Sequence, residues 1–213
     1  MDSIYNGPNA VFEICCNDGS KYGFENSTLA SALTNEGLMD VNGSQPMGNE
    51  GSIFNNGSLI IEGFNTTGIY NSGIIINTDT LIVKEGWTGI FIEESSTEIG
   101  FTNEGYCSFS NLGGAAIDMT MGEASNSGTI QISELGKGIE IEPNSSTSTL
   151  FHNLAGASIS IIEARDYGIR LAPEASFINE TSSLLHIMDT EDIPLSIDSS
   201  ATFEGYHNIT IED

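Results

Sequence analysis

The chain has 213 residues, of which 30 are acidic and only five are Lys or Arg, so its formal net charge is −25. This charge disfavours nucleic acid and anionic membranes as partners, and no apolar stretch is long enough to insert into a membrane. Apolar residues make up 38% of the chain, which is low for a globular domain but suits an elongated array with a narrow interior.

The N-terminal segment, residues 1–32, fits the repeat of the later chain poorly. Residues 10–15 alternate like a strand, and Phe24-Glu25-Asn26 is similar to a signature that returns downstream. We expect this segment to form a first, irregular coil that caps the array, because solenoid ends must cover the core and block edge pairing. Residues 42–50 read as a loop.

A repeat occupies residues 33–213. Each unit begins with an apolar–polar–apolar triplet, which is typical of a strand with one buried face. The triplets recur about every 24 residues, a spacing that marks a solenoid, propeller or array. Their first buried residues are Met39, Leu59, Leu81, Cys107, Ile130, Ile159, Leu185 and Ile209.

A second strand is predicted nine or ten residues after each triplet begins. In several copies a glycine precedes it, which fits a corner that needs positive φ or a close backbone approach. The second strands start at Ile69, Ile90, Ile117, Ile139, Ile169 and Leu195.

A third strand precedes each following triplet, and in its last three copies the buried residue is Phe151, Phe177 or Phe203, at intervals of 26 residues. We expect these rings to stack. In seven copies an asparagine follows two residues after the buried position, which predicts an inward ladder of bonded amides. The ladder residues are Asn35, Asn55, Asn77, Asn103, Asn126, Asn153 and Asn179.

Three short strands per coil, an asparagine column and stacked aromatics together resemble the right-handed parallel β-helix proteins, which include pectate-lyase-like enzymes and many bacterial surface adhesins. The resemblance implies an all-β fold: one continuous domain of about seven to eight coils. It specifies no activity, because one fold hosts unrelated functions. The chain ends just after a new triplet begins, so we expect it to be a fragment of a longer array.

The sequence holds no recognisable catalytic set. No Gly-x-Ser-x-Gly motif or spaced Ser, His and Asp indicates a triad, and the signatures of β-helix polygalacturonases are absent. Three residues between first and second strands are candidate ligand-binding groups: Trp87, Arg165 and Tyr167. For Trp87 the alternative is an indole folded over the rim of the core. For Arg170 we expect a salt bridge with Glu140 of the preceding coil.

An acidic column is predicted four residues past each triplet start, where Glu85, Asn111, Glu134, Glu163 and Asp189 fall. Stacked coils would bring Glu134, Glu163 and Asp189 within about 4.8 Å of one another. Oxygen-rich sites of this kind suit Ca²⁺, so a calcium site is one interpretation. An ordinary solvated acidic edge is the other.

These observations favour a non-enzymatic β-helix module of a secreted or cell-surface protein, acting as an adhesin, stalk or ligand-binding scaffold. Its expected partner is a glycan or a neighbouring cell surface. The chain shows no signal peptide, and we expect one to have been removed. The alternative is a carbohydrate-active enzyme, a polysaccharide lyase or glycoside hydrolase, with its site on the loops after the first strand. The sequence leaves the oligomeric state open.

Overall fold

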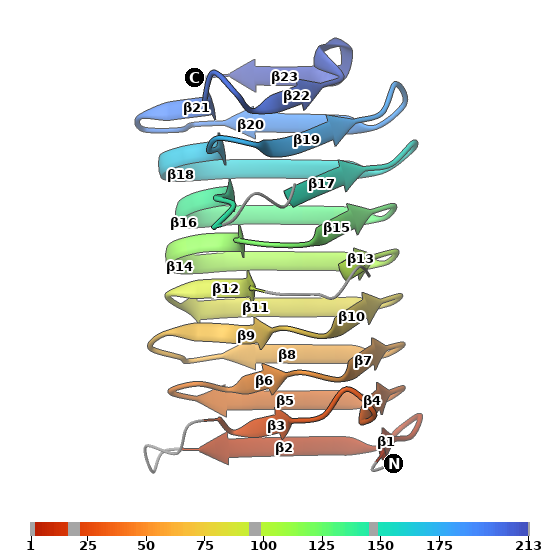
Figure 1. Ribbon diagram of the computed structural model, residues 1–213. Coiled ribbons are helices and arrows are strands. Elements are labelled where there is room, and N and C mark those ends of the chain that lie inside the picture. Colours follow the sequence, from red (N-terminus) through yellow and green to blue (C-terminus); the bar gives the residue numbers. More distant parts are fainter. Residues whose placement is uncertain (1–2, 17–21, 94–98, 145–148, 213) are drawn as a thin grey trace.

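The computed structural model describes residues 3–16, 22–93, 99–144 and 149–212. The chain winds into a parallel β-solenoid of about seven turns, with successive coils stacked from the N-terminus to the C-terminus (Figure 1). Strands of neighbouring coils pair in parallel. The predicted all-β, parallel β-helix architecture is confirmed.

Two sheets run the length of the solenoid. The larger has 14 strands and holds the first and second strands of every coil, which join through a bend into one long strand in three of the coils. Its first strands are β2 (Val11–Cys16), β5 (Leu38–Gly43), β8 (Ser58–Glu62), β11 (Thr80–Gly86), β20 (Leu184–Met188) and β23 (Ile209–Glu212). Its second strands are β3 (Phe24–Asn26), β6 (Met47–Asn49), β9 (Thr67–Asn71), β12 (Thr88–Ile92) and β21 (Ile193–Ile197). The joined strands are β14 (Tyr106–Met119), β16 (Thr129–Ile141) and β18 (Ser158–Leu171).

The smaller sheet has nine strands and holds the third strand of each coil. A short 3-10 helix, η1 (Tyr206–Asn208), lies between its last strand and β23. The nine strands are β1 (Ser3–Asn6), β4 (Ala32–Asn35), β7 (Ser52–Asn55), β10 (Ile74–Asn77), β13 (Ile99–Asn103), β15 (Glu123–Asn126), β17 (Thr149–Asn153), β19 (Ala175–Asn179) and β22 (Thr202–Glu204).

The core is one continuous cluster of inward side chains, because alternate residues of each strand point to the interior. The predicted aromatic stack lies within it. The rings of Phe151 and Phe177 have centroids 5.3 Å apart with planes 5° from parallel, and Phe203 continues the stack at 5.3 Å and 7°. Phe151 and Phe177 are fully buried.

The predicted asparagine ladder is confirmed and runs one coil further than expected, to Asn6. Each side-chain Nδ2 donates to the Oδ1 of the asparagine in the next coil, as from Asn126 to Asn153 and from Asn153 to Asn179, both at 2.8 Å. Most of these amides also donate to a backbone carbonyl, such as Leu184 O for Asn153. The ladder therefore satisfies polar groups that are fully buried.

A second, shorter ladder stands at the corner after the second strand. Asn26 donates to Asn49 at 2.7 Å, and Asn49 donates to Asn71 at 2.6 Å. Asn26 follows Phe24 in β3, a second strand, so its similarity to the third-strand signature was misleading. In the coils that follow, the position is apolar, beginning with Ile92 and Met119.

Two expectations for the N-terminal coils need correction. Residues 42–50 are not simply a loop, because β5 extends to Gly43 and β6 covers Met47–Asn49. Strands β1, β2 and β3 pair in register with β4, β5 and β6, so the described part of residues 1–32 continues the regular coil. The role of this segment as a cap stays a prediction.

Glycines before the second strands serve close packing between coils. A Cβ on Gly89 would lie 2.4 Å from the carbonyl oxygen of Ala116, and one on Gly168 would lie 2.5 Å from that of Pro194. Neither residue has positive φ. Of the two explanations that the sequence allowed, close backbone approach is therefore correct.

Candidate functional site

The bend after the first strand has a left-handed backbone conformation in successive coils. In the N-terminal coils the residue is glycine, with φ of 138° at Gly43 and 68° at Gly63. From Glu85 onward this bend residue belongs to the acidic column that the sequence indicated. Its members have positive φ: Glu85 (60°), Asn111 (53°), Glu134 (55°), Glu163 (58°) and Asp189 (50°). A non-glycine residue pays about 1–2 kcal/mol in this conformation. The acidic side chains thus occupy a position where glycine would be less strained.

All of these side chains except Glu85 line a groove of about 630 Å³ on the outside of the bend. Glu134 comes from β16, Glu163 from β18, and Asp189 and Glu191 from the segment between β20 and β21. Neighbouring coils are in register here, since Ser133 pairs with Ile162 and Ile162 with Met188. The predicted juxtaposition of Glu134, Glu163 and Asp189 is therefore present at the level of the backbone.

Arg165 of β18 also lines this groove and is the one basic side chain among the described residues that do so. Its Nη2 lies 3.4 Å from the carbonyl oxygen of Gly113, two coils away, to which it donates a long hydrogen bond. The guanidinium therefore reaches along the groove across the coil between them. Arg165 thus lies in the groove, and its role as a ligand-binding residue stays a prediction.

Trp87 packs on a pair of glycines at the edge of the same groove. A Cβ on Gly113 would lie 2.5 Å from the indole ring, and one on Gly114 would lie 3.1 Å from its Nε1, so the ring lies over this glycine pair. The side chain is 59% exposed. Gly113 itself lines the groove. The indole does not close over the core rim and instead offers an accessible aromatic surface at the edge of the groove.

Tyr167 is not among the residues that line the groove. It pairs with Lys137 and Ile193 in neighbouring strands, and the guanidinium of Arg170 lies 5.6 Å from its ring centroid. Its position past the bend directs it toward the charged network of the second strands. Neither Trp87 nor Tyr167 lines the groove, but Trp87 packs on Gly113, which does, whereas Tyr167 lies with the second strands.

That network is centred on Glu140, which is 5% exposed. Its carboxylate accepts hydrogen bonds from Lys137 Nζ at 2.8 and 2.9 Å and from Arg170 Nη1 at 2.8 Å. The predicted pairing of Arg170 with Glu140 is confirmed. Asp118, which no sequence pattern indicated, pairs with Glu140 in the adjoining strand. Burial, with a smaller contribution from Glu140, raises the pKa of the Asp118 carboxyl from 3.8 to about 6.

Calcium finds little support in this arrangement. Among the described residues, no group of three or more His, Cys, Asp or Glu side chains is placed so that it could hold a metal ion. Glu134, Glu163 and Asp189 share the groove but are not placed as a set that could hold one ion. The interpretation that remains for the column is an open, acidic groove wall.

Comparison of the chain with models of protein families, with curated protein sequences and with solved structures finds no match. The described part of the chain also has no helix with the length and apolar character needed to cross a membrane. The groove is therefore interpreted from its own residues.

Proposed function

We propose that this protein is a non-enzymatic, glycan-binding β-solenoid module that acts as an adhesin or stalk outside the cell or on its surface. The observation that carries the proposal is the groove beside Trp87, where an exposed indole adjoins a cavity lined by Arg165 and several carboxylates. An aromatic face packs against the apolar face of a sugar ring, and a few placed polar groups orient its hydroxyls.

The charge of the groove favours a neutral glycan. Glu134, Glu163, Asp189 and Glu191 outnumber Arg165, so the uronate or sulfate groups of an acidic polysaccharide would be repelled. The lining residues rise through successive coils, about 4.8 Å apart. A neutral sugar chain lying along the solenoid axis would therefore meet a new set of side chains at each coil.

A glycan array followed by calorimetry on neutral and acidic polysaccharides tests this proposal. We expect saturable binding to a neutral glycan, and Trp87→Ala should weaken it by at least about ten-fold. Tyr5→Ala is a matched control, because Tyr5 is 62% exposed but lies in β1, at the N-terminal end of the solenoid. Unchanged binding by Trp87→Ala would contradict the proposed site.

A carbohydrate-active enzyme is the second candidate, because four carboxylates share the groove and glycoside hydrolysis needs two of them about 5–9.5 Å apart. A reducing-sugar assay on the glycans that bind separates the two functions. We expect no turnover. Turnover that Glu163→Gln abolishes, with binding retained, would replace the non-enzymatic proposal with the enzymatic one.

The location outside the cell is a separate part of the proposal. It is supported by the acidic composition and by the resemblance of the repeat to surface adhesins. Immunolabelling of intact and permeabilised cells tests it. Labelling only after permeabilisation would contradict a surface role, while glycan binding could still hold.

A further inference from the structure

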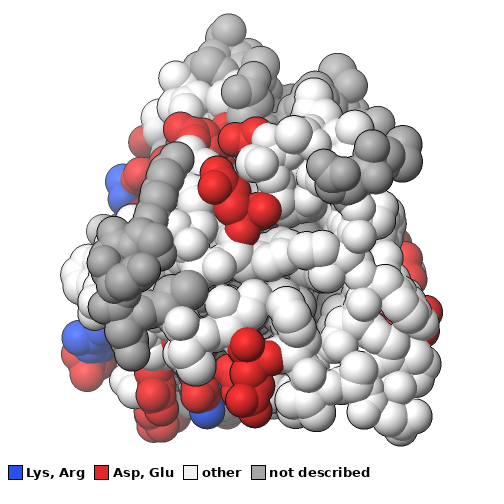
Figure 2. Space-filling view, turned by 90° about the horizontal axis from the view of Figure 1, so that it is seen from below, with Lys and Arg blue, Asp and Glu red and all other residues white. Residues whose placement is uncertain are grey.

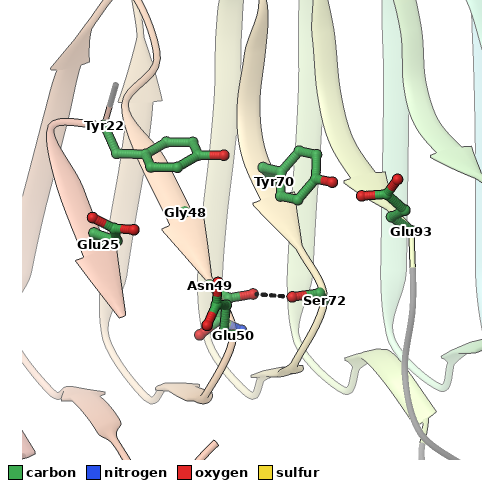
Figure 3. Close-up of a pocket in the computed structure, with 8 residues that line it drawn as sticks. All are labelled: Tyr22, Glu25, Gly48, Asn49, Glu50, Tyr70, Ser72 and Glu93. Atoms are coloured by element: carbon green, nitrogen blue, oxygen red, sulfur yellow. Dashed lines mark hydrogen bonds between the residues drawn. The ribbon is translucent and has the colours of Figure 1, made fainter. Parts of the chain in front are cut away.

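A second cavity, of about 420 Å³, lies in the N-terminal coils and shares no lining residue with the groove. Its walls include Tyr22, which precedes β3, and Tyr70 of β9 (Figure 3). The ring centroids are 6.4 Å apart with planes inclined by 42°, and Phe91 of β12 extends this aromatic row beyond Tyr70 at 5.5 Å. The cavity therefore has an aromatic wall built from successive coils.

A missing side chain makes room for this wall. Gly48 stands in the outward column between Glu25 and Tyr70, with which it pairs in the neighbouring coils. A Cβ on Gly48 would lie 2.8 Å from the ring of Tyr22, so the tyrosine ring lies directly over the glycine backbone. The absence of a side chain at Gly48 allows Tyr22 to approach the sheet.

Three carboxylates complete the cavity: Glu25, Glu50 and Glu93. Figure 3 shows them around the two tyrosines, with Glu93 on the hydroxyl side of Tyr70. The hydroxyl of Ser72 adds another oxygen and donates to the carbonyl of Asn49 at 3.4 Å. No lysine or arginine is among the described lining residues. Burial, and then the charges of Glu25, Glu50 and Glu93, raise the pKa of Tyr22.

Further acidic side chains lie at this end of the molecule. Viewed from the end that holds β1 and β2, Figure 2 shows acidic side chains in several groups around the rim and few basic ones. A cation approaching the cavity would be attracted by this field as well as by the three carboxylates. The chemistry of the site selects for positive charge.

A small metal ion does not fit this arrangement. Among the described residues no three carboxylates are close enough to hold one ion together. Spread carboxylates and aromatic faces instead suit a bulkier cation, whose alkyl part contacts the rings while its charge lies near a ring face. A primary ammonium has three N–H donors, and the surrounding carboxylate and hydroxyl oxygens can accept them.

We propose that the cavity lined by Tyr22, Tyr70, Glu25, Glu50 and Glu93 is a binding site for a primary alkylammonium group, such as the end of a lysine side chain. The proposal is independent of glycan binding at the groove, since the two sites have no residue in common. It would give the module a contact with basic protein segments, in addition to its contact with sugars.

Titration of the 15N-labelled protein with butylammonium chloride at fixed ionic strength tests this site. We expect saturable NMR shifts at the amides of Gly48, Asn49 and Ser72. Sodium chloride should not produce them, and tetramethylammonium, which has no N–H donor, should bind more weakly. Equal shifts with sodium would reduce the effect to general screening, and tighter binding of tetramethylammonium would overturn the primary-amine specificity.

Variants separate the aromatic and carboxylate contributions. Tyr70→Leu removes the ring face and should weaken butylammonium binding about five-fold, while Tyr70→Phe should retain it. Glu50→Gln keeps the shape of the side chain and should also weaken binding. Glu104→Gln, at an exposed acid outside the cavity, is the matched control. Unchanged affinity in both Tyr70→Leu and Glu50→Gln, with the remaining amide spectrum intact, would overturn the proposal.

Discussion

The coils up to residue 93 and the coils from residue 99 onward have the same fold but differ in the residues at their corners. The N-terminal coils up to residue 77 have two asparagine ladders and glycine at the described first bends, Gly43 and Gly63, whereas the coil of β11 and β12 already has Glu85 at the first bend and Ile92 at the second corner. The later coils keep one ladder, place apolar residues at the second corner and put acidic residues at the first bend. The long ladder, which both regions share, fixes the register between coils, while the residues in the other stacked columns differ between the two regions.

The outward column of the second strands shows the same division. In the N-terminal coils it contains Gly48, which the ring of Tyr22 covers, followed by Tyr70 and Phe91, which form the aromatic row with Tyr22. In the later coils it contains Asp118, Glu140 and Arg170, which belong to the charged network. One stacked position therefore builds an aromatic cavity wall in one region and an ionic cluster in the other.

The largest expected loss of stability follows from a substitution in the aromatic stack of the later coils. Phe177→Ala removes the middle ring of three and should lower the free energy of unfolding by about 3–5 kcal/mol. Phe91→Ala, on the outward column, should cost clearly less. Denaturant titration of both variants measures this. Equal losses would mean that the outward aromatic row contributes as much as the core.

The charged network should make the later coils sensitive to pH. The pKa of Asp118 is raised to about 6, so its contribution to stability is complete below about pH 3.8 and is lost as the pH rises through 6. Asp118→Asn cannot ionise and should be about 2 kcal/mol more stable than the wild type at pH 7, with no gain at pH 4.

Glu25→Gln is the control for this pH effect, because Glu25 occupies the same outward column in β3 but is exposed. Thermal unfolding at pH 4 and pH 7 measures the difference for both variants. A gain for Asp118→Asn that is equal at the two pH values would show that its ionisation is not the cause.

The two ladders should differ in how much an apolar substitution costs. Asn153→Leu interrupts the long ladder and should destabilise the fold by about 1–3 kcal/mol, because Asn126 loses an acceptor and Asn179 a donor. Asn71→Ile, at the end of the short ladder, extends the apolar column by one coil and should cost less. Urea titration compares them, and a larger loss for Asn71→Ile would reverse the assigned roles.

The smallest expected effects are at the first bend. Glu163→Gly removes the steric strain of a glutamate with positive φ. It should stabilise the protein by up to about 1 kcal/mol, because the relieved strain exceeds the conformational entropy that glycine loses on folding. Gly63→Glu makes the opposite exchange in the N-terminal region and should destabilise it by about as much. Melting temperatures that shift in the same direction for both variants would contradict a conformational origin.

The sequence predicted the regular features because they repeat. Eight apolar triplets and a long asparagine column indicated the strands, their register and the ladder, and Phe151, Phe177 and Phe203 indicated the stack. The eighth triplet is not buried as predicted, since Ile211 is 46% exposed. The acidic column was also visible, as were Trp87 and Arg165. A fixed offset from a triplet gives a place in the stack but not the direction of a side chain, so the sequence could not indicate that Tyr167, unlike Arg165, lies outside the groove.

The features that were missed occur in too few coils to form a pattern. The short ladder has three members, and Asn26 follows a phenylalanine just as the long-ladder residues near the C-terminus do. The cavity depends on Tyr22, which lies before a strand, and on Gly48, whose lack of a side chain leaves room for the Tyr22 ring. Asp118 stood out neither by spacing nor by motif, because its environment comes from residues in neighbouring coils.

The long ladder has a direction. Every amide nitrogen donates toward the C-terminal end, from Asn6 to Asn35 and onward to Asn179, whose Nδ2 in turn donates to the carbonyl oxygen of Gly205. The side-chain dipoles therefore add up along the solenoid axis and polarise one another. Any stretch of this ladder presents an acceptor on one face and a donor on the other. A coil stacked in the same orientation continues this pattern, so the asparagines favour one polarity as well as one register.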